Sequence, residues 1–172
     1  MVELRTVLFL CTGNSARSIL AEAIANRAGR GRVRAFSAGS KPRGRVHPQV
    51  IELLIDLGHE TAHLRSKSWK EFTAPNAPVM DLVVTLCDEA AGESCPLWPG
   101  HPLTAHWGLP DPIAAKSARA VRAALADAYR AIEARVHALL DLPLDTIDPG
   151  QLPHRLRDIG AGGPMRIVAW SL

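Results

Sequence analysis

Short apolar runs alternate with amphipathic stretches over most of the chain, and this alternation predicts its secondary structure. The apolar runs predict strands, the last of them short, at residues 6–11, 33–38, 81–86 and 103–107. Between the strands, apolar side chains recur every three or four positions. This spacing predicts helices over about residues 20–28, 48–57 and 116–140. An alternation of strands and helices predicts an open parallel α/β sheet with right-handed crossovers.

Three chemically reactive side chains follow predicted strands directly. Cys11 ends the first strand, Cys87 follows the third, and Asp111 comes shortly after the fourth. Ligands of open parallel sheets bind beyond the carboxyl ends of the strands. We therefore expect these three side chains to converge at one edge of the sheet.

The last thirty residues have no clear periodicity, because prolines and glycines interrupt them repeatedly. A lone apolar run occupies residues 165–170. We expect one catalytic domain over residues 1–142. Residues 143–172 are expected to form a tail that packs on this domain or stays partly mobile.

Length and composition set limits on the class of protein. A chain of 172 residues with 47% hydrophobic and 22% charged residues is typical of one globular domain. No apolar run approaches the ~18 residues of a membrane span, and the start of the chain, with Glu3 and Arg5, is unlike a signal peptide. We therefore expect a cytoplasmic protein, in which three cysteines favour redox or metal chemistry over a static disulfide framework.

Charge is distributed unevenly, although the net charge is only +3. No acidic residue lies between Glu22 and Glu52, whereas the basic residues there are Arg27, Arg30, Arg32, Arg34, Lys41, Arg43 and Arg45. Only Phe36 offers an aromatic ring for base stacking, and no basic helix is evident. We interpret this stretch as solvated loops that also favour anionic ligands, and we expect no nucleic-acid or membrane partner.

The most specific feature is the segment FLCTGNSARS at residues 9–18. A short loop between a strand and a helix can turn successive backbone N–H groups inward, and the helix adds the positive end of its dipole. Arg17 offers a planar fork for two oxygens of a tetrahedral oxyanion, and Ser18 can donate a hydrogen bond to a Cys11 thiolate. Asn14 tolerates left-handed backbone. A strand-end cysteine is otherwise often a small core residue, but this setting favours a nucleophile.

Further motifs show a family resemblance. The loop at residues 11–18, AEA at 21–23, FSAGS at 36–40 and Asp111-Pro112 resemble the low-molecular-weight protein tyrosine phosphatase superfamily. More narrowly, the segments CTGNSARS, VTLCDEAAGESCPLWPG and HWGLPDP resemble the arsenate reductases built on that fold. The similarity covers roughly residues 5–140. It implies a three-layer αβα fold around a four-stranded parallel sheet.

The resemblance also implies roles for individual residues. Cys11 would be the nucleophile and Asp111 the general acid, while Asn14 and Ser37 would support the loop. The oxyanion would be bound by Thr12, Gly13, Asn14, Ser15, Ala16, Arg17 and Ser18. Pro112 holds Asp111 extended at a loop rim, where it can protonate a departing oxygen. Aspartate is, however, also common as a helix N-cap.

The resemblance raises the question of a bound metal. Some relatives hold a potassium ion behind the loop, and Glu22 could contribute to such a site. Lys67 stands where a further acidic ligand is expected, which argues against potassium. The spacing of the histidines and Cys95 matches no zinc pattern. We therefore predict no metal site and no tightly bound cofactor.

Two departures argue against a tyrosine phosphatase. Ile113 stands just after the Asp-Pro pair, where these phosphatases carry an aromatic residue that docks the substrate ring. Ala16 stands where they commonly have a second cysteine in the loop. The two cysteines outside the loop, Cys87 and Cys95, favour a reductase instead.

Reduction of As(V) to As(III) takes two electrons, which a second thiol can supply. Cys87 would attack the sulfur of a Cys11–arsenic adduct, releasing arsenite and forming a Cys11–Cys87 disulfide. Cys95 would then attack Cys87 and move the disulfide outward to an external thiol. The segment CDEAAGESC is short and free of proline, so it can shift as this relay requires. Cys87 could otherwise be a core residue at a strand end.

We therefore predict an arsenate reductase that acts on arsenate, with phosphate or sulfate as mimics. Thioredoxin or a glutathione–glutaredoxin pair would regenerate it. The alternative is a low-molecular-weight protein tyrosine phosphatase or phosphomonoesterase, which needs only Cys11, Arg17 and Asp111. A third reading is a non-enzymatic module that binds anions or senses redox state.

Overall fold

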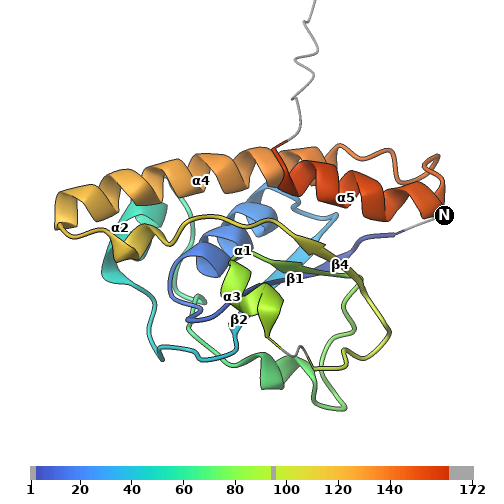
Figure 1. Cartoon of the computed structure of the whole chain (residues 1–172), viewed down its shortest axis with the longest axis horizontal. Coiled ribbons are helices and arrows are strands. Elements are labelled where there is room, and N and C mark those ends of the chain that lie inside the picture. Colours follow the sequence, from blue (N-terminus) through green and yellow to red (C-terminus); the bar gives the residue numbers. More distant parts are fainter. Residues whose placement is uncertain (1–2, 94–95, 163–172) are drawn as a thin grey trace, which may run out of the picture.

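The computed structural model describes residues 3–93 and 96–162 and is built around one parallel sheet (Figure 1). Four strands pair in the order β2-β1-β3-β4. Their bounds are Thr6–Cys11 (β1), Arg34–Gly39 (β2), Leu82–Thr85 (β3) and Leu103–His106 (β4). The predicted four-stranded parallel sheet is confirmed, and each predicted strand is found within one or two residues of its expected ends.

Both faces of the sheet are covered, which explains why the strands are almost wholly apolar. Along β1, Val7 and Phe9 point into one core cluster, whereas Leu8 and Leu10 point into another. Helices cover the first face (Figure 1), and they are α1 (Arg17–Ala28), α2 (Pro48–Asp56), α4 (Ala118–Leu140) and α5 (Leu152–Gly160). The other face is packed by the short 3₁₀ helix η1 (Trp69–Phe72) and by neighbouring loops with Met80 and Trp98.

Helix α5 lies in the region for which the sequence predicted no helix. Trp107 donates a hydrogen bond from Nε1 to the carbonyl of Leu156 at 3.1 Å, and the α5 side chains Leu152 and Leu156 are buried. A Cβ atom on Gly160 would lie 2.3 Å from the His106 carbonyl, so the end of α5 packs backbone against backbone on the sheet. The apolar run at residues 165–170 lies outside the described residues.

Two short elements flank the edge of the sheet where the reactive side chains were expected. Helix α3 (Asp88–Gly92) follows β3, and the 3₁₀ helix η2 (Pro112–Ala114) follows the loop after β4. The helix α3 is one turn long and is capped by Cys87, whose sulfur accepts a hydrogen bond from the Ala90 N–H at 3.4 Å. Within the described ranges, no helix is long and apolar enough to cross a membrane.

Candidate active site

The loop between β1 and α1 has the backbone arrangement of an anion-binding nest. Its carbonyls face away from the centre: those of Thr12, Gly13 and Ser15 accept hydrogen bonds from backbone N–H groups of the segment 41–47, at 2.9–3.0 Å. In the described part of the chain, the N–H groups of residues 13–17 donate to no protein acceptor. Asn14 has a φ of 43°, the left-handed conformation expected for it. Donors gathered in this way can bind an oxyanion.

A chain of hydrogen bonds directs a hydroxyl proton at the Cys11 sulfur. The Asn14 side chain is fully buried, and its Oδ1 accepts from the Lys67 backbone N–H at 2.8 Å. This contact orients the amide, so Nδ2 donates to Ser18 Oγ at 2.8 Å. The Ser18 hydroxyl proton is then left to donate to Cys11 Sγ, 2.9 Å away. Such a donor stabilises the thiolate form of a cysteine.

A small cavity of about 20 Å³ opens on Cys11. It is lined by loop residues and by Arg17, Arg43, Asp111 and Ile113. Arg17 is largely buried, and its Nη1 donates to the carbonyl of Leu109 at 2.8 Å, which orients the guanidinium. Asp111 Oδ1 accepts the Ile113 N–H at 3.1 Å. Asp111 is therefore the N-cap of η2, and it also lines the cavity, where a general acid would have to lie.

Cys87 belongs to the same small buried cluster as Cys11. Cys11 and Cys87 are both free, both buried, and form one apolar cluster with Ala90. Thr12 Oγ1 approaches Cys87 Sγ at 3.5 Å. The structure thus brings together Cys11, Cys87, Arg17 and Asp111, whereas Cys95 lies outside the described residues.

Behind the loop is a buried charged cluster. Ser37 donates from its hydroxyl to Glu22 Oε2, on α1, so any support that it gives the loop is indirect. Lys67 Nζ lies 3.5 Å from the same Glu22 oxygen, and only 6% and 7% of the two charged side chains are exposed. Burial lowers the pKa of Lys67, and the Glu22 carboxylate partly offsets this effect.

These residues do not fit a potassium ion. The Glu22 carboxylate already interacts with an ammonium group, and a second cation beside it would be repelled. No group of three or more histidine, cysteine or carboxylate side chains suited to a metal exists among the described residues.

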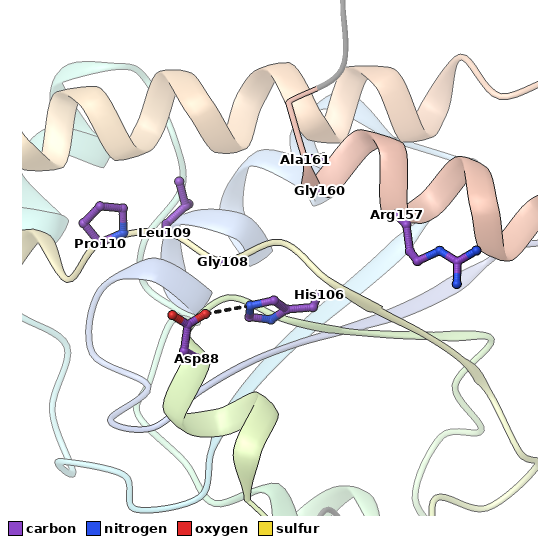
Figure 2. Close-up of a pocket in the computed structure, with 8 residues that line it drawn as sticks. All are labelled: Asp88, His106, Gly108, Leu109, Pro110, Arg157, Gly160 and Ala161. Atoms are coloured by element: carbon purple, nitrogen blue, oxygen red, sulfur yellow. Dashed lines mark hydrogen bonds and ion pairs between the residues drawn. The ribbon is translucent and has the colours of Figure 1, made fainter.

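A larger cavity, of about 610 Å³, is lined in part by Gly108, Leu109 and Pro110 of the loop that leads to Asp111. Figure 2 shows His106 and Asp88 facing each other in it, with α5 forming the opposite wall. His106 Nε2 lies 2.8 Å from Asp88 Oδ1, and its Nδ1 lies 2.8 Å from Thr85 Oγ1. No cysteine of the described ranges lines this cavity. We therefore place the chemistry in the smaller one.

Sequence reasoning missed two residues of this site. Arg43 was noted only as part of a basic stretch, although it lines the cavity over Cys11. Lys67 was noted only because it stands where an acidic potassium ligand was expected. In the structure it pairs with Glu22, and its backbone N–H orients Asn14. The absence of acidic residues around Arg43 was the only signal for the first, and no local signal existed for the second.

Comparisons with known proteins identify a family model and several similar proteins. The family model described as low molecular weight phosphotyrosine protein phosphatase matches residues 6–148. The arsenate reductase of Bacillus subtilis strain 168 is 36% identical over 115 residues, which cover 67% of this chain and 79% of that protein.

Solved structures show the same likeness. A thioredoxin-dependent arsenate reductase of Corynebacterium glutamicum is 25% identical, with a TM-score of 0.61 over 80% of this chain. This chain spans only 61% of that protein's length. An arsenate reductase solved in its phosphate-binding state is 27% identical, with a TM-score of 0.57 over 77% of this chain and 97% of that one.

Proposed function

Because this chain belongs to the low molecular weight phosphotyrosine protein phosphatase family, we propose that it is an arsenate reductase whose electrons come from its own cysteines. The observation that carries the proposal is one small buried cluster at the anion-binding loop that holds two free cysteines, Cys11 and Cys87. A phosphatase needs only the first of them. The names of the similar proteins support the same reading.

The first step is attack of the Cys11 thiolate on arsenate. A sulfur–arsenic bond forms, and one arsenic–oxygen bond breaks as Asp111 gives a proton to the departing oxygen, which leaves as water. The inward N–H groups of the loop and the Arg17 guanidinium stabilise the charge on the remaining oxygens. The product of this step is a covalent Cys11–As(V) adduct.

The second step is the reduction itself. The Cys87 thiolate attacks the Cys11 sulfur, so a disulfide forms while the sulfur–arsenic bond breaks. The electron pair of the broken bond stays on arsenic, which becomes As(III) and leaves as arsenite. The two thiols together lose two electrons. Cys95 then attacks Cys87, which frees Cys11 and leaves a Cys87–Cys95 disulfide for an external dithiol to reduce.

The local structure around Cys87 suits a group that must move during turnover. Its sulfur caps α3, a single helical turn whose polar residues Asp88 and Glu89 are exposed. Helices of this length have little stability of their own, and loss of one such cap costs on the order of 1 kcal/mol. Unwinding α3 can therefore carry Cys87 from Cys11 towards Cys95 at small cost.

The deciding experiment compares two serine variants. Cys87→Ser should release no arsenite, because no Cys87 thiol attacks the Cys11 sulfur and hydrolysis of the adduct only returns arsenate. Cys95→Ser should release about one arsenite per enzyme in a single burst and then stop, because the Cys11–Cys87 disulfide remains. Steady turnover by Cys87→Ser would overturn the relay. Slow hydrolysis of p-nitrophenyl phosphate should survive in both variants, since it needs neither cysteine.

We further propose thioredoxin as the external reductant, with glutaredoxin and glutathione as the alternative. The support is the thioredoxin dependence of the similar Corynebacterium protein. Oxidation of NADPH during arsenate reduction, followed separately with each complete reductant system, distinguishes the two. Turnover with glutaredoxin and glutathione alone would overturn this part of the proposal.

A further inference from the structure

The segment that follows β2 is attached to the anion-binding loop by its backbone. The Arg43 N–H donates to the carbonyl of Gly13 at 2.9 Å. The next residue, Gly44, donates to Ser66 Oγ at 3.2 Å, and the Ser66 hydroxyl donates in turn to the same Gly13 carbonyl at 3.2 Å. The backbone of Arg43 therefore has a fixed position relative to the nest.

The Arg43 side chain lies over the loop and lines the cavity. A Cβ atom on Gly13 would lie 3.1 Å from Arg43 Nε and 3.3 Å from its Cγ, so the arginine stem passes close to the glycine backbone. The same cavity is lined by Cys11, Arg17 and Asp111. Arg43 thus places a second guanidinium at the cavity over the nucleophile.

The two arginines that line the cavity differ in the hydrogen bonds that their guanidinium groups make with the protein. Arg17 is largely buried, and its guanidinium is oriented by the carbonyl of Leu109. Across the described chain, the guanidinium of Arg43 makes no hydrogen bond or ion pair with another protein group, and the residue is exposed. Its donors are therefore available to a ligand. Among the described residues, Asp111 is the single carboxylate lining the cavity.

We propose that Arg43 is a specificity-determining residue that binds the oxygen of the oxyanion facing away from the nest. The nest and Arg17 can serve the other three oxygens of a tetrahedral ion. In free arsenate or phosphate the outward oxygen carries charge or a proton, and it can accept a hydrogen bond from a guanidinium. In a monoester that oxygen carries an organic group and the ion has less charge to offer. Arg43 therefore favours the free ion over its esters.

This inference rests on the proposed function, since it concerns the same site, but it can be tested without turnover. Isothermal titration measures the Kd of inorganic phosphate and of methyl phosphate at one pH and one ionic strength. Arg43→Gln should weaken phosphate binding about tenfold, as expected for loss of one charge-assisted hydrogen bond at an exposed site. It should weaken methyl phosphate binding much less, so the preference for the free ion falls.

Arg45→Gln is the matched control. Arg45 lies two residues further along the same segment, is exposed, and does not line the cavity. The Arg45→Gln variant removes the same charge but not the proposed contact. It should therefore leave the ratio of the affinities for phosphate and methyl phosphate unchanged. Equal effects of the two variants, or an equal loss for phosphate and methyl phosphate in Arg43→Gln, would overturn the proposal.

Kinetics with arsenate give the second readout. Arg43→Gln should raise KM about tenfold and change kcat far less, because the contact is made in the bound substrate before chemistry begins. Arg43→Lys keeps the charge but loses the planar fork, and it should recover part of the affinity. If the wild-type protein reduced no arsenate, the proposed function would fail, whereas the affinity ratio would still decide the role of Arg43.

Discussion

The buried ion pair behind the anion-binding loop allows a stability prediction of known sign and size. We consider the substitution Lys67→Met, which keeps the length of the side chain and removes its charge. The Glu22 carboxylate, only 7% exposed, would retain the Ser37 hydroxyl as a donor but lose its ammonium partner. Removing one member of a buried pair costs about 3–5 kcal/mol, because the other charge is left buried and uncompensated. This is a large part of the stability of a typical domain.

The expected result is a fall in Tm of about 6–20 °C, since a chain of this length loses about 2–4 °C per kcal/mol. Unfolding in urea, followed by tryptophan fluorescence, measures the free energy directly, and Trp107 is a fully buried reporter. The double variant Lys67→Met/Glu22→Gln should recover most of the loss, because no buried charge remains. Lys70→Met, at an exposed position on η1, should stay within about 0.5 kcal/mol of the wild type.

Two results would refute this reasoning. A cost below about 1 kcal/mol for Lys67→Met, or a double variant no more stable than the single one, would mean that Glu22 is not buried with an obligatory partner. Separately, stabilisation of the wild-type protein by potassium chloride but not by sodium chloride would show that a potassium ion binds where we argue that it does not fit. We expect the two salts to have the same effect.

Two further predictions concern a buried histidine and the candidate general acid. Burial, reinforced by the charge of Arg27, lowers the pKa of His59, whose Nε2 lies 2.7 Å from the Tyr129 hydroxyl. The unfolded chain therefore binds this proton more readily, and the stability present above about pH 6.5 should be lost as the pH falls below it. Thermal melts at pH 8 and pH 5.5 should show a smaller loss for His59→Gln than for the wild type, and equal losses would contradict the assignment. Asp111→Asn should keep the cap on η2 but lower kcat by roughly 10²–10⁴-fold at nearly unchanged Tm, and an unchanged kcat would exclude a proton-donating role.

Local patterns were sufficient for most of the fold. The strands could be predicted because a parallel strand covered on both faces must be apolar along its whole length, as β1 is. Helix α4 begins at Ala118, two residues later than its periodicity suggested, because Ser117 caps it through the Ala120 N–H. These features depend on contacts within a few residues, which a sequence displays directly.

Helix α5 could not be predicted, because its stability comes from other parts of the chain. Its own sequence contains a proline in the first turn and a glycine at the end. By pattern alone those residues indicate interruptions. In the structure, Trp107 donates to the Leu156 carbonyl, and Gly160 lies against the backbone of His106 at the end of β4. The proline is tolerated because a first-turn N–H has no partner in the helix.

The sequence by itself determined the reactive loop, because a nucleophile, a run of small residues and an arginine at short spacing can form a nest from one continuous segment. It also determined that further thiols were available for redox chemistry. The ends of the predicted strands also indicated that Cys87 and Asp111 would converge on this loop. Only the tertiary structure decided that Lys67 pairs with Glu22 and that Arg43 lines the cavity. Each of these contacts joins segments at least thirty residues apart, and the packing of the strands and loops, which no local pattern encodes, brings them together.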